Sequence, residues 1–147
     1  MQAIAIRELK PDQLLSAYGK SVNKFNVRTR GRPERSAREH AIIALRRQAF
    51  GLRMKALREA AGLTLIDAAR LAEVSSPRKL SQYETTCYPP GDIVMRLAPH
   101  YGVDPEMICE LVLEHSDPAM FEGLTGKPGF APTEKQITEY LSKTRKK

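Results

Sequence analysis

Residues that could take part in chemistry gather in two polar segments of the sequence. The first segment, residues 28–35, is basic and contains Arg30-Gly31-Arg32-Pro33. The second segment, residues 76–82, begins with Ser-Pro and carries Arg78, Lys79 and Gln82. Arginine and lysine can donate hydrogen bonds to phosphate and to guanine, and glutamine can form paired hydrogen bonds with adenine. These residue types therefore indicate binding chemistry directed at polyanions.

The residues most often used in catalysis and metal binding are few and far apart. His40, His100 and His115 stand at no metal-ligand interval from one another or from a cysteine. Cys87 and Cys109 form no CxxC pair, and Cys87 is expected to be an inert thiol because no basic pair lies beside it. The sequence contains no GxGxxG, P-loop, GxSxG or HExxH motif. We therefore expect no enzyme activity, no metal site and no cofactor.

The charge is unevenly distributed along the 147 residues, whose net charge is +7. Residues 1–49 carry eleven lysines and arginines against four acids, residues 50–113 seven against eight, and residues 114–147 six against five. The whole basic excess therefore lies in the first third of the chain. Such a balance favours a polyanionic partner, most often nucleic acid.

Length and composition exclude several classes of protein. A chain of 147 residues fits one ordinary domain with extensions, and it can bury a core without a metal or a disulfide. No apolar run is long enough to span a membrane, and we expect no secretory signal because the first residues lack a basic start and a long apolar stretch. With two cysteines and no disulfide framework, a reduced cytoplasmic location is expected.

Start and stop signals predict helices along most of the chain, and hence an all-α fold. The expected helices are residues 11–26 (opened by Pro11), one from Ala37 (capped by Ser36 with Glu39), Leu65–Ala72 (Thr64 with Asp67), one from Pro77 (Ser76), one from about Asp92, one from Pro105 (Asp104) and one after Thr133 (with Gln136). The helix from Pro105 is expected to bury Met107, Ile108, Leu111 and Val112. Residues 85–91 and 123–132 are expected to be loops.

Two helix boundaries stay open on the sequence alone. The helix from Ala37 either continues to Ala61, just ahead of Gly62, or breaks near Gly51. The helix from about Asp92 must bend or stop near Pro99, because an interior proline lacks a backbone donor and clashes with the preceding turn.

A dense set of residues between positions 50 and 112 resembles a known pattern. The matching positions are Phe50-Gly51, Met54, Leu57-Arg58, Gly62-Leu63-Thr64, Ala69, Leu71, Val74-Ser75, Leu80, Tyr83-Glu84, Pro90, Leu97-Ala98, Tyr101-Gly102-Val103 and Met107-Ile108. The stretch resembles the Cro/repressor-type, or xenobiotic-response-element, family of helix-turn-helix DNA-binding proteins. The resemblance implies a five-helix lambda-repressor-like domain, here with N- and C-terminal helical extensions. We accordingly divide the chain into a helical extension (1–27), a basic arm (28–36), a helix-turn-helix domain (37–113) and a C-terminal extension (114–147).

The resemblance also implies roles for single residues. Ala69 would lie where the two motif helices meet closely, and Leu80 with Tyr83 would hold the second helix on the core. In the family, that second helix lies in the major groove with its N-terminal residues at base edges. The base-contacting candidates are Ser76, Arg78, Lys79 and Gln82, and the phosphate-contacting candidates are Thr64 and Ser75. A polar, solvated helix face is the alternative interpretation.

The sequence departs from the family pattern at the turn of the motif. Glu73 stands where the family usually has a glycine, and the stretch from Val74 to Glu84 is one residue longer than usual. We therefore expect a turn longer by one residue, which would tilt the second helix. Residues 85–88 also lack the basic residues and the glycine common in the following loop.

The basic segment resembles a second motif. Arg30-Gly31-Arg32-Pro33 matches the core of an AT-hook, which lies extended in the minor groove of A·T-rich DNA. This resemblance implies minor-groove contacts by Arg28, Arg30, Gly31, Arg32 and Arg35. Glu34 departs from the usual basic flank, and a solvated basic linker is the alternative interpretation.

The resemblance implies a sequence-specific, DNA-binding transcriptional regulator, which we expect to be a repressor that binds double-stranded DNA as a homodimer. The dimer would form through the apolar stripes of residues 11–26 (Leu14, Tyr18, Val22) and 133–143 (Ile137, Tyr140, Leu141), unless these stripes pack on their own domain. The alternative is an antitoxin or anti-activator that uses the same fold to bind a partner protein. We expect a cytoplasmic protein of bacterial, plasmid or phage origin with no membrane partner.

Overall fold

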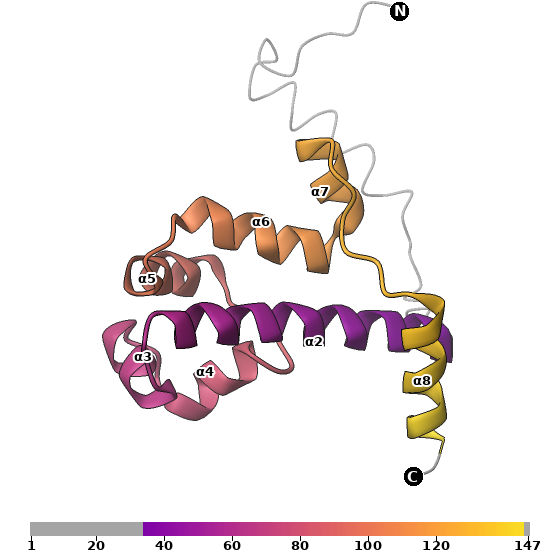
Figure 1. Cartoon of the computed structure of the whole chain (residues 1–147), viewed down its shortest axis with the longest axis horizontal. Coiled ribbons are helices and arrows are strands. Elements are labelled where there is room, and N and C mark those ends of the chain that lie inside the picture. Colours follow the sequence, from indigo (N-terminus) through magenta and orange to yellow (C-terminus); the bar gives the residue numbers. More distant parts are fainter. Residues whose placement is uncertain (1–33, 146–147) are drawn as a thin grey trace, which may run out of the picture. The chain divides into compact units, whose positions relative to one another are not determined.

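The computed structural model describes residues 34–145, which contain seven α-helices and no strand (Figure 1). The helices are α2 (Ala37–Ala60), α3 (Leu65–Leu71), α4 (Pro77–Tyr83), α5 (Gly91–Tyr101), α6 (Pro105–Ser116), α7 (Pro118–Thr125) and α8 (Glu134–Thr144). The predicted all-α class is confirmed. The expected helix over residues 11–26 and residues 28–33 of the basic arm lie outside the described residues.

The long helix α2 is the element against which most of the others pack. Its capping box is formed as predicted: the Ser36 hydroxyl accepts a hydrogen bond from the Glu39 amide (3.2 Å), and the Glu39 carboxylate accepts one from the Ser36 amide (2.7 Å). The helix continues through Gly51 for 24 residues, and Gly62 follows its end with a left-handed φ of 72°. In Figure 1, α3 and α4 lie on one side of α2, and α5 and α6 lie on the other.

The hydrophobic core lies where α2, α4, α5 and α6 meet. Its fully buried large side chains include Phe50, Met54, Leu80, Leu97 and Ile108. Leu80 and Ile108 were expected to be buried, and Leu57 is partly buried at the edge of the cluster. Each such side chain contributes about 1.5–3 kcal/mol of transfer free energy on burial.

Helix α5 does not end at its proline. Pro99 lies inside the last turn, and the helix continues to Tyr101 before Gly102 adopts a left-handed φ of 68°. The sequence predicted a bend or a stop near Pro99, and the helix ends two residues after it. A proline this close to the end removes only one intrahelical hydrogen bond, and the following glycine ends the helix.

Helix α7 was missed by the sequence analysis, which expected a loop over residues 123–132. The structure shows helix from Pro118 to Thr125, so the predicted loop is wrong at residues 123–125. The signals are present: the Asp117 side chain caps the helix by accepting from the Met120 amide (3.1 Å), and Gly126 ends it at a φ of 69°. Helix α7 is amphipathic over little more than two turns, and this length gave too weak an apolar pattern to detect.

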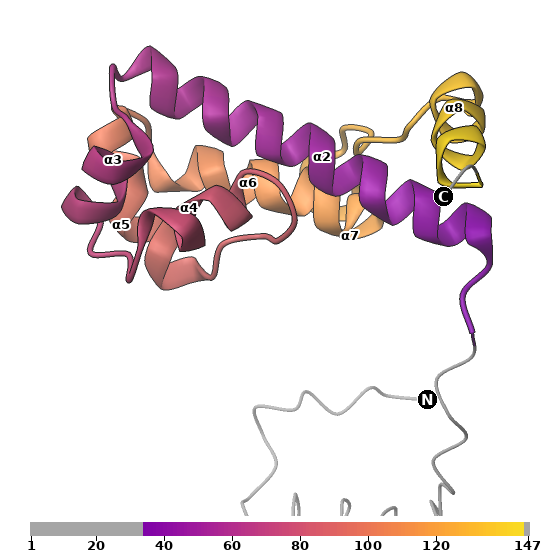
Figure 2. The ribbon, with the colours of Figure 1, turned by 90° about the horizontal axis from the view of Figure 1, so that it is seen from below.

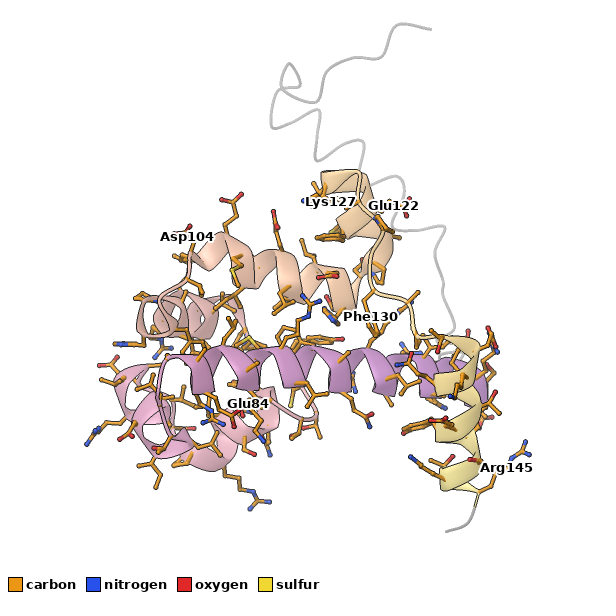
Figure 3. All side chains as sticks on the ribbon, viewed as in Figure 1. Glu84, Asp104, Glu122, Lys127, Phe130 and Arg145 are labelled. Carbon is orange, nitrogen blue, oxygen red and sulfur yellow. The ribbon has the colours of Figure 1, made fainter. Side chains whose placement is uncertain are left out.

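The connection from α7 to α8 is fastened to the core through His115. The imidazole is buried, and its Nδ1 lies 2.9 Å from the carbonyl oxygen of Leu111. It stacks on Phe130 with ring centroids 4.9 Å apart and meets Phe50 edge-on at 6.0 Å. Phe130, labelled in Figure 3, also donates its amide to the carbonyl of Glu114 (3.0 Å). The segment after α7 is thus part of the packed structure.

Helix α8 packs across the N-terminal part of α2 (Figure 2). Its capping box, Thr133 with Gln136, is formed as predicted, and Ile137 is buried against the domain. Glu134 of α8 forms an ion pair with Arg38 of α2. For the stripe of residues 133–143, the alternative that it packs on its own domain is therefore the one observed.

Gly51 and Gly123 are both helical glycines, and we predict opposite effects of alanine at the two positions. A Cβ atom at Gly51 would overlap the backbone carbonyl of Glu84, whereas nothing lies within 4 Å of a Cβ at Gly123. Gly51→Ala should lower the free energy of unfolding by about 1–3 kcal/mol through overpacking, although alanine favours helix. Gly123→Ala should raise that free energy by up to about 1 kcal/mol. Urea unfolding measures both, and equal effects at the two positions would contradict the contact at Gly51.

Candidate nucleic-acid interface

Helices α3 and α4 form the helix-turn-helix unit. Thr64 caps α3 by accepting from the Asp67 amide (3.1 Å), and Ser76 caps α4 by accepting from the Lys79 amide (3.1 Å). The helices contact each other, and Ala69 of α3 is buried, as expected for a small residue at a close helix crossing. Leu80 and Tyr83 are buried and hold α4 on the core, which confirms the prediction that these two residues anchor the helix.

The turn between the two helices places Glu73 in a left-handed conformation with a φ of 54°. It is the only non-glycine residue with a positive φ in the described part of the chain. This conformation costs an ordinary L-residue roughly 1 kcal/mol. The Val74 amide donates to the carbonyl of Ala69 (2.8 Å), and the Glu73 carbonyl accepts from Arg96 Nη1 of α5 (3.2 Å). This left-handed φ explains why the family that the sequence resembles usually has a glycine at this position.

A buried ion pair fixes the far end of α4 to α2. Arg58 Nε donates to Glu84 Oε1 (2.7 Å) and Nη2 to Oε2 (3.2 Å), while Nη1 donates to the carbonyl of Leu63 (2.7 Å). The side chains are only 8% and 6% exposed. Glu84, labelled in Figure 3, lies on the side of α2 that carries α4. This one contact joins α2, the loop before α3 and the end of α4.

The outer side of α4 carries the predicted base-contacting residues. Arg78 and Lys79 are exposed and Gln82 is partly exposed, so one short helix brings them together. Arg78 and Gln82 are four residues apart and therefore share a helix face. Lys79 Nζ lies 5.4 Å from the centre of the Tyr83 ring, a cation–π contact that orients its side chain.

The serine and threonine candidates have structural roles in this conformation. The Ser76 oxygen accepts the N-cap hydrogen bond, which leaves its hydroxyl hydrogen to donate elsewhere. The Thr64 hydroxyl donates to Asp67 Oδ2 (2.8 Å), so the carboxylate already lies at the first turn of α3, where a phosphate would bind. Ser75 is exposed in the turn. Phosphate contacts by Thr64 and Ser75 stay a prediction.

The basic residues of α2 differ in their surroundings. Arg38 is engaged with Glu134, and this hydrogen-bonded guanidinium lowers the pKa of the Glu134 carboxyl. Arg46 has a buried Nε atom without a hydrogen-bond partner, whereas Arg47 is exposed. Arg35, the last residue of the basic arm before Ser36, is partly exposed. Arg35 and Arg47 are thus better placed than Arg38 to meet a polyanion.

The residues that sequence reasoning missed are those that position α4. Arg58 and Glu84 were noted as part of the resemblance, but their pairing across 26 residues was not predicted. Arg96, which holds the turn through the Glu73 carbonyl, was not singled out. Helical periodicity reports which face of a helix is apolar, and it carries no signal for such long-range polar pairs.

Comparison with known proteins gives one match. Residues 49–111, less than half of the chain, match a family model described as a helix-turn-helix domain. No curated protein and no solved structure gives a significant match. The match supports a helix-turn-helix DNA-binding protein, and its range includes the helices α3 and α4 described above. The Cro/repressor subtype and the AT-hook resemblance stay predictions.

Among residues 34–145, no group of three or more histidine, cysteine, aspartate or glutamate side chains is arranged to hold a metal ion. Within that same range, no helix has the length and apolarity needed to cross a membrane.

Tyr101 adds a titratable group beside the Arg58–Glu84 pair. Its hydroxyl is buried and has no hydrogen-bond partner in the described structure. Burial, and next the neighbouring Glu84 carboxylate, raise the pKa of Tyr101 to about 12, against the opposing effect of Arg58. The neutral phenol is therefore strongly favoured in the folded state.

We predict that the free energy of unfolding of the Tyr101→Phe variant falls less at high pH than that of the parent. In the unfolded chain the phenol ionises near its ordinary pKa of about 10. Below pH ~10 the phenol is neutral in both states, so it causes no loss of stability. As the pH rises from about 10 toward the folded pKa, the phenol ionises in the unfolded chain only, and the folded state loses stability. At pH 7 the variant should be as stable as the parent or more stable by about 1 kcal/mol, because an unpaired buried hydroxyl is removed.

Urea unfolding at pH 7 and pH 11 measures this difference. The parent should lose about 1 kcal/mol more than Tyr101→Phe between the two pH values. Tyr140→Phe, in α8, is the matched control and should behave as the parent does. An equal alkaline loss in the parent and in Tyr101→Phe would show that this phenol does not stay neutral.

Proposed function

We propose that the chain is a sequence-specific DNA-binding transcriptional regulator that places α4 in the major groove. The observation that carries the proposal is the two-sided construction of α4. Its inner side is buried through Leu80 and Tyr83, and its outer side presents Arg78, Lys79 and Gln82. A rigidly held helix with these side chains can form the paired hydrogen bonds that distinguish guanine and adenine.

The distribution of charge supports a second, sequence-independent contribution. Residues 50–113 carry seven lysines and arginines against eight acids, so the domain itself attracts phosphate weakly. The attraction then comes from the basic residues before and within the first half of α2. We propose that the arm of Arg28, Arg30, Gly31, Arg32 and Arg35 lies in a neighbouring minor groove and supplies much of it.

Repression is the regulatory mode we propose, since a protein bound across a promoter by α4 and the arm blocks access to it. The antitoxin or anti-activator alternative needs a surface for a partner protein. The exposed apolar residues of α7, Met120 and Leu124, favour such a surface.

Alanine substitutions on α4 test base reading. Arg78→Ala and Gln82→Ala should each cost about 1–3 kcal/mol at a preferred site, because each removes hydrogen bonds to one base. Non-specific binding should change much less. The preferred site is first selected from random duplexes, and affinity is then measured by fluorescence anisotropy on the selected and on a scrambled duplex. Lys135→Ala, exposed on α8, is the control. Equal losses on both duplexes would contradict base reading by α4.

Removal of the arm tests the electrostatic contribution. Each phosphate contact adds about 0.9 to the slope of log affinity against log salt. Deleting residues 1–35 should therefore reduce that slope by several units and weaken binding to every sequence. Arg30→Lys with Arg32→Lys keeps the charge but fits a narrow minor groove less well, since an ammonium group holds its water more tightly. This double variant should lose affinity mainly on A·T-flanked sites. An unchanged salt slope after the deletion would remove the arm from the DNA interface.

A further inference from the structure

A groove lies between α2, α6 and α7, on the side of α2 opposite to α4 (Figure 1). Its volume of about 500 Å³ falls within the range of about 300–1,000 Å³ that is typical of small-molecule sites. Its apolar lining consists of Ala56 and Leu57 of α2, Met107 and Leu111 of α6, and Phe121 of α7. None of the base-contacting candidates lines it, so a ligand in this groove would leave the outer side of α4 free.

The walls of the groove are helical and hold their side chains at fixed positions. One face of α2 supplies lining residues at three- and four-residue spacing, namely Arg53, Ala56 and Leu57. One face of α6 supplies a second set with the same spacing, namely Met107, Glu110, Leu111 and Glu114. Phe121, the buried residue of α7, forms the third wall. The groove is therefore part of the folded helical structure, as in most small-molecule sites.

Met107 is the apolar lining residue that remains most accessible. It was expected to be buried, yet it is 46% exposed, whereas its neighbour Ile108 is fully buried in the core. A methionine side chain is flexible and polarizable, so it can adapt its shape to a ligand in the groove.

The two long walls of the groove carry opposite charges. Arg53 on the α2 wall is exposed, and on the α6 wall Glu110 is exposed and Glu114 is half-buried. Among residues 34–145, none of these three side chains is within ion-pair distance of an opposite charge. A ligand with a single charge would meet one wall of like charge, which is unfavourable. A small molecule that carries both charges next to an apolar group complements both walls and the apolar lining.

We infer that the groove binds a free α-amino acid with a large apolar side chain, such as leucine or phenylalanine. The carboxylate of the ligand accepts hydrogen bonds from the Arg53 guanidinium, whose planar group matches a carboxylate. The ammonium group of the ligand donates to Glu110 and Glu114, and its side chain packs on the apolar lining. This inference goes beyond the proposed function and does not depend on it, because the ligand does not touch α4.

Titration with free amino acids and their derivatives provides the first test. Isothermal titration calorimetry on the full chain without DNA should give a dissociation constant of about 1 mM or tighter for L-leucine or L-phenylalanine. Three probes each lack one of the recognised groups: N-acetyl-L-leucine lacks the ammonium, L-leucinamide lacks the carboxylate and glycine lacks the side chain. Each of the three should bind at least about tenfold more weakly than L-leucine, since each leaves one part of the groove without a partner.

Substitutions on the two charged walls provide the second test. Arg53→Met should weaken L-leucine binding at least about tenfold but should not weaken L-leucinamide binding, because that probe has no carboxylate. Glu110→Gln combined with Glu114→Gln should weaken L-leucine binding in the same way but should not weaken N-acetyl-L-leucine binding. Lys55→Met is the matched control, since Lys55 is an exposed cation of α2 that does not line the groove, and it should bind L-leucine as the parent does.

Three results would overturn the inference. The first is a parent chain that binds neither L-leucine nor L-phenylalanine up to about 10 mM. The second is equal affinity for L-leucine, L-leucinamide and N-acetyl-L-leucine, which would show that the charged walls are not used. The third is L-leucine binding that is unaffected by Arg53→Met and by the double glutamine variant. Circular dichroism establishes that the variants fold, and because no DNA is present, these results are independent of whether α4 reads bases.

Discussion

The position of α4 depends on the contact between Gly51, Arg58 and Glu84. Glycine lets the backbone of α2 approach the end of α4, and the ion pair two turns further along α2 fixes the distance. Both charges are removed from water, so the pair is tolerated only because the guanidinium is fully engaged, including its bond to Leu63. Removing one partner of such a pair usually costs about 3–5 kcal/mol, because the other charge is left buried without a partner. This contact and the burial of Leu80 and Tyr83 together fix how α4 lies on the core.

Much of the helix layout was predictable because α2, α3, α4 and α8 each have a capping residue at their start. Ser36, Thr64, Ser76 and Thr133 all accept the capping hydrogen bonds that their spacing predicts. The choice between one helix and two at Gly51 was not predictable, because it depends on a contact with Glu84 some thirty residues away. Helix α7 has the same kind of start signal. Its apolar pattern is short and faces outward, so hydrophobic periodicity does not predict this helix.

The candidate site was predictable in part for the same reason. Arg78, Lys79 and Gln82 were identified because Leu80 and Tyr83 had to face inward, which leaves the other positions of a short helix outside. Thr64 and Ser76 show the limit of this reasoning. A serine or threonine hydroxyl can serve equally well as a helix cap or as a phosphate ligand. Only the hydrogen bonds of the folded chain show that both caps are formed. The absence of the usual glycine indicated that the backbone at Glu73 is strained. The hydrogen bond from Arg96 to the Glu73 carbonyl was not predictable.

The straight run of α2 before Gly51 sets a spacing. From Ser36, where the basic arm joins, to Gly51, which touches the end of α4, the helix rises about 22 Å. Stacked base pairs rise about 3.4 Å each, so this length equals some six or seven base pairs. Because α2 is one continuous helix over this length, the point where the chain enters the helix is held at a fixed distance from the end of α4. Insertions in the loops of the domain would leave this distance unchanged.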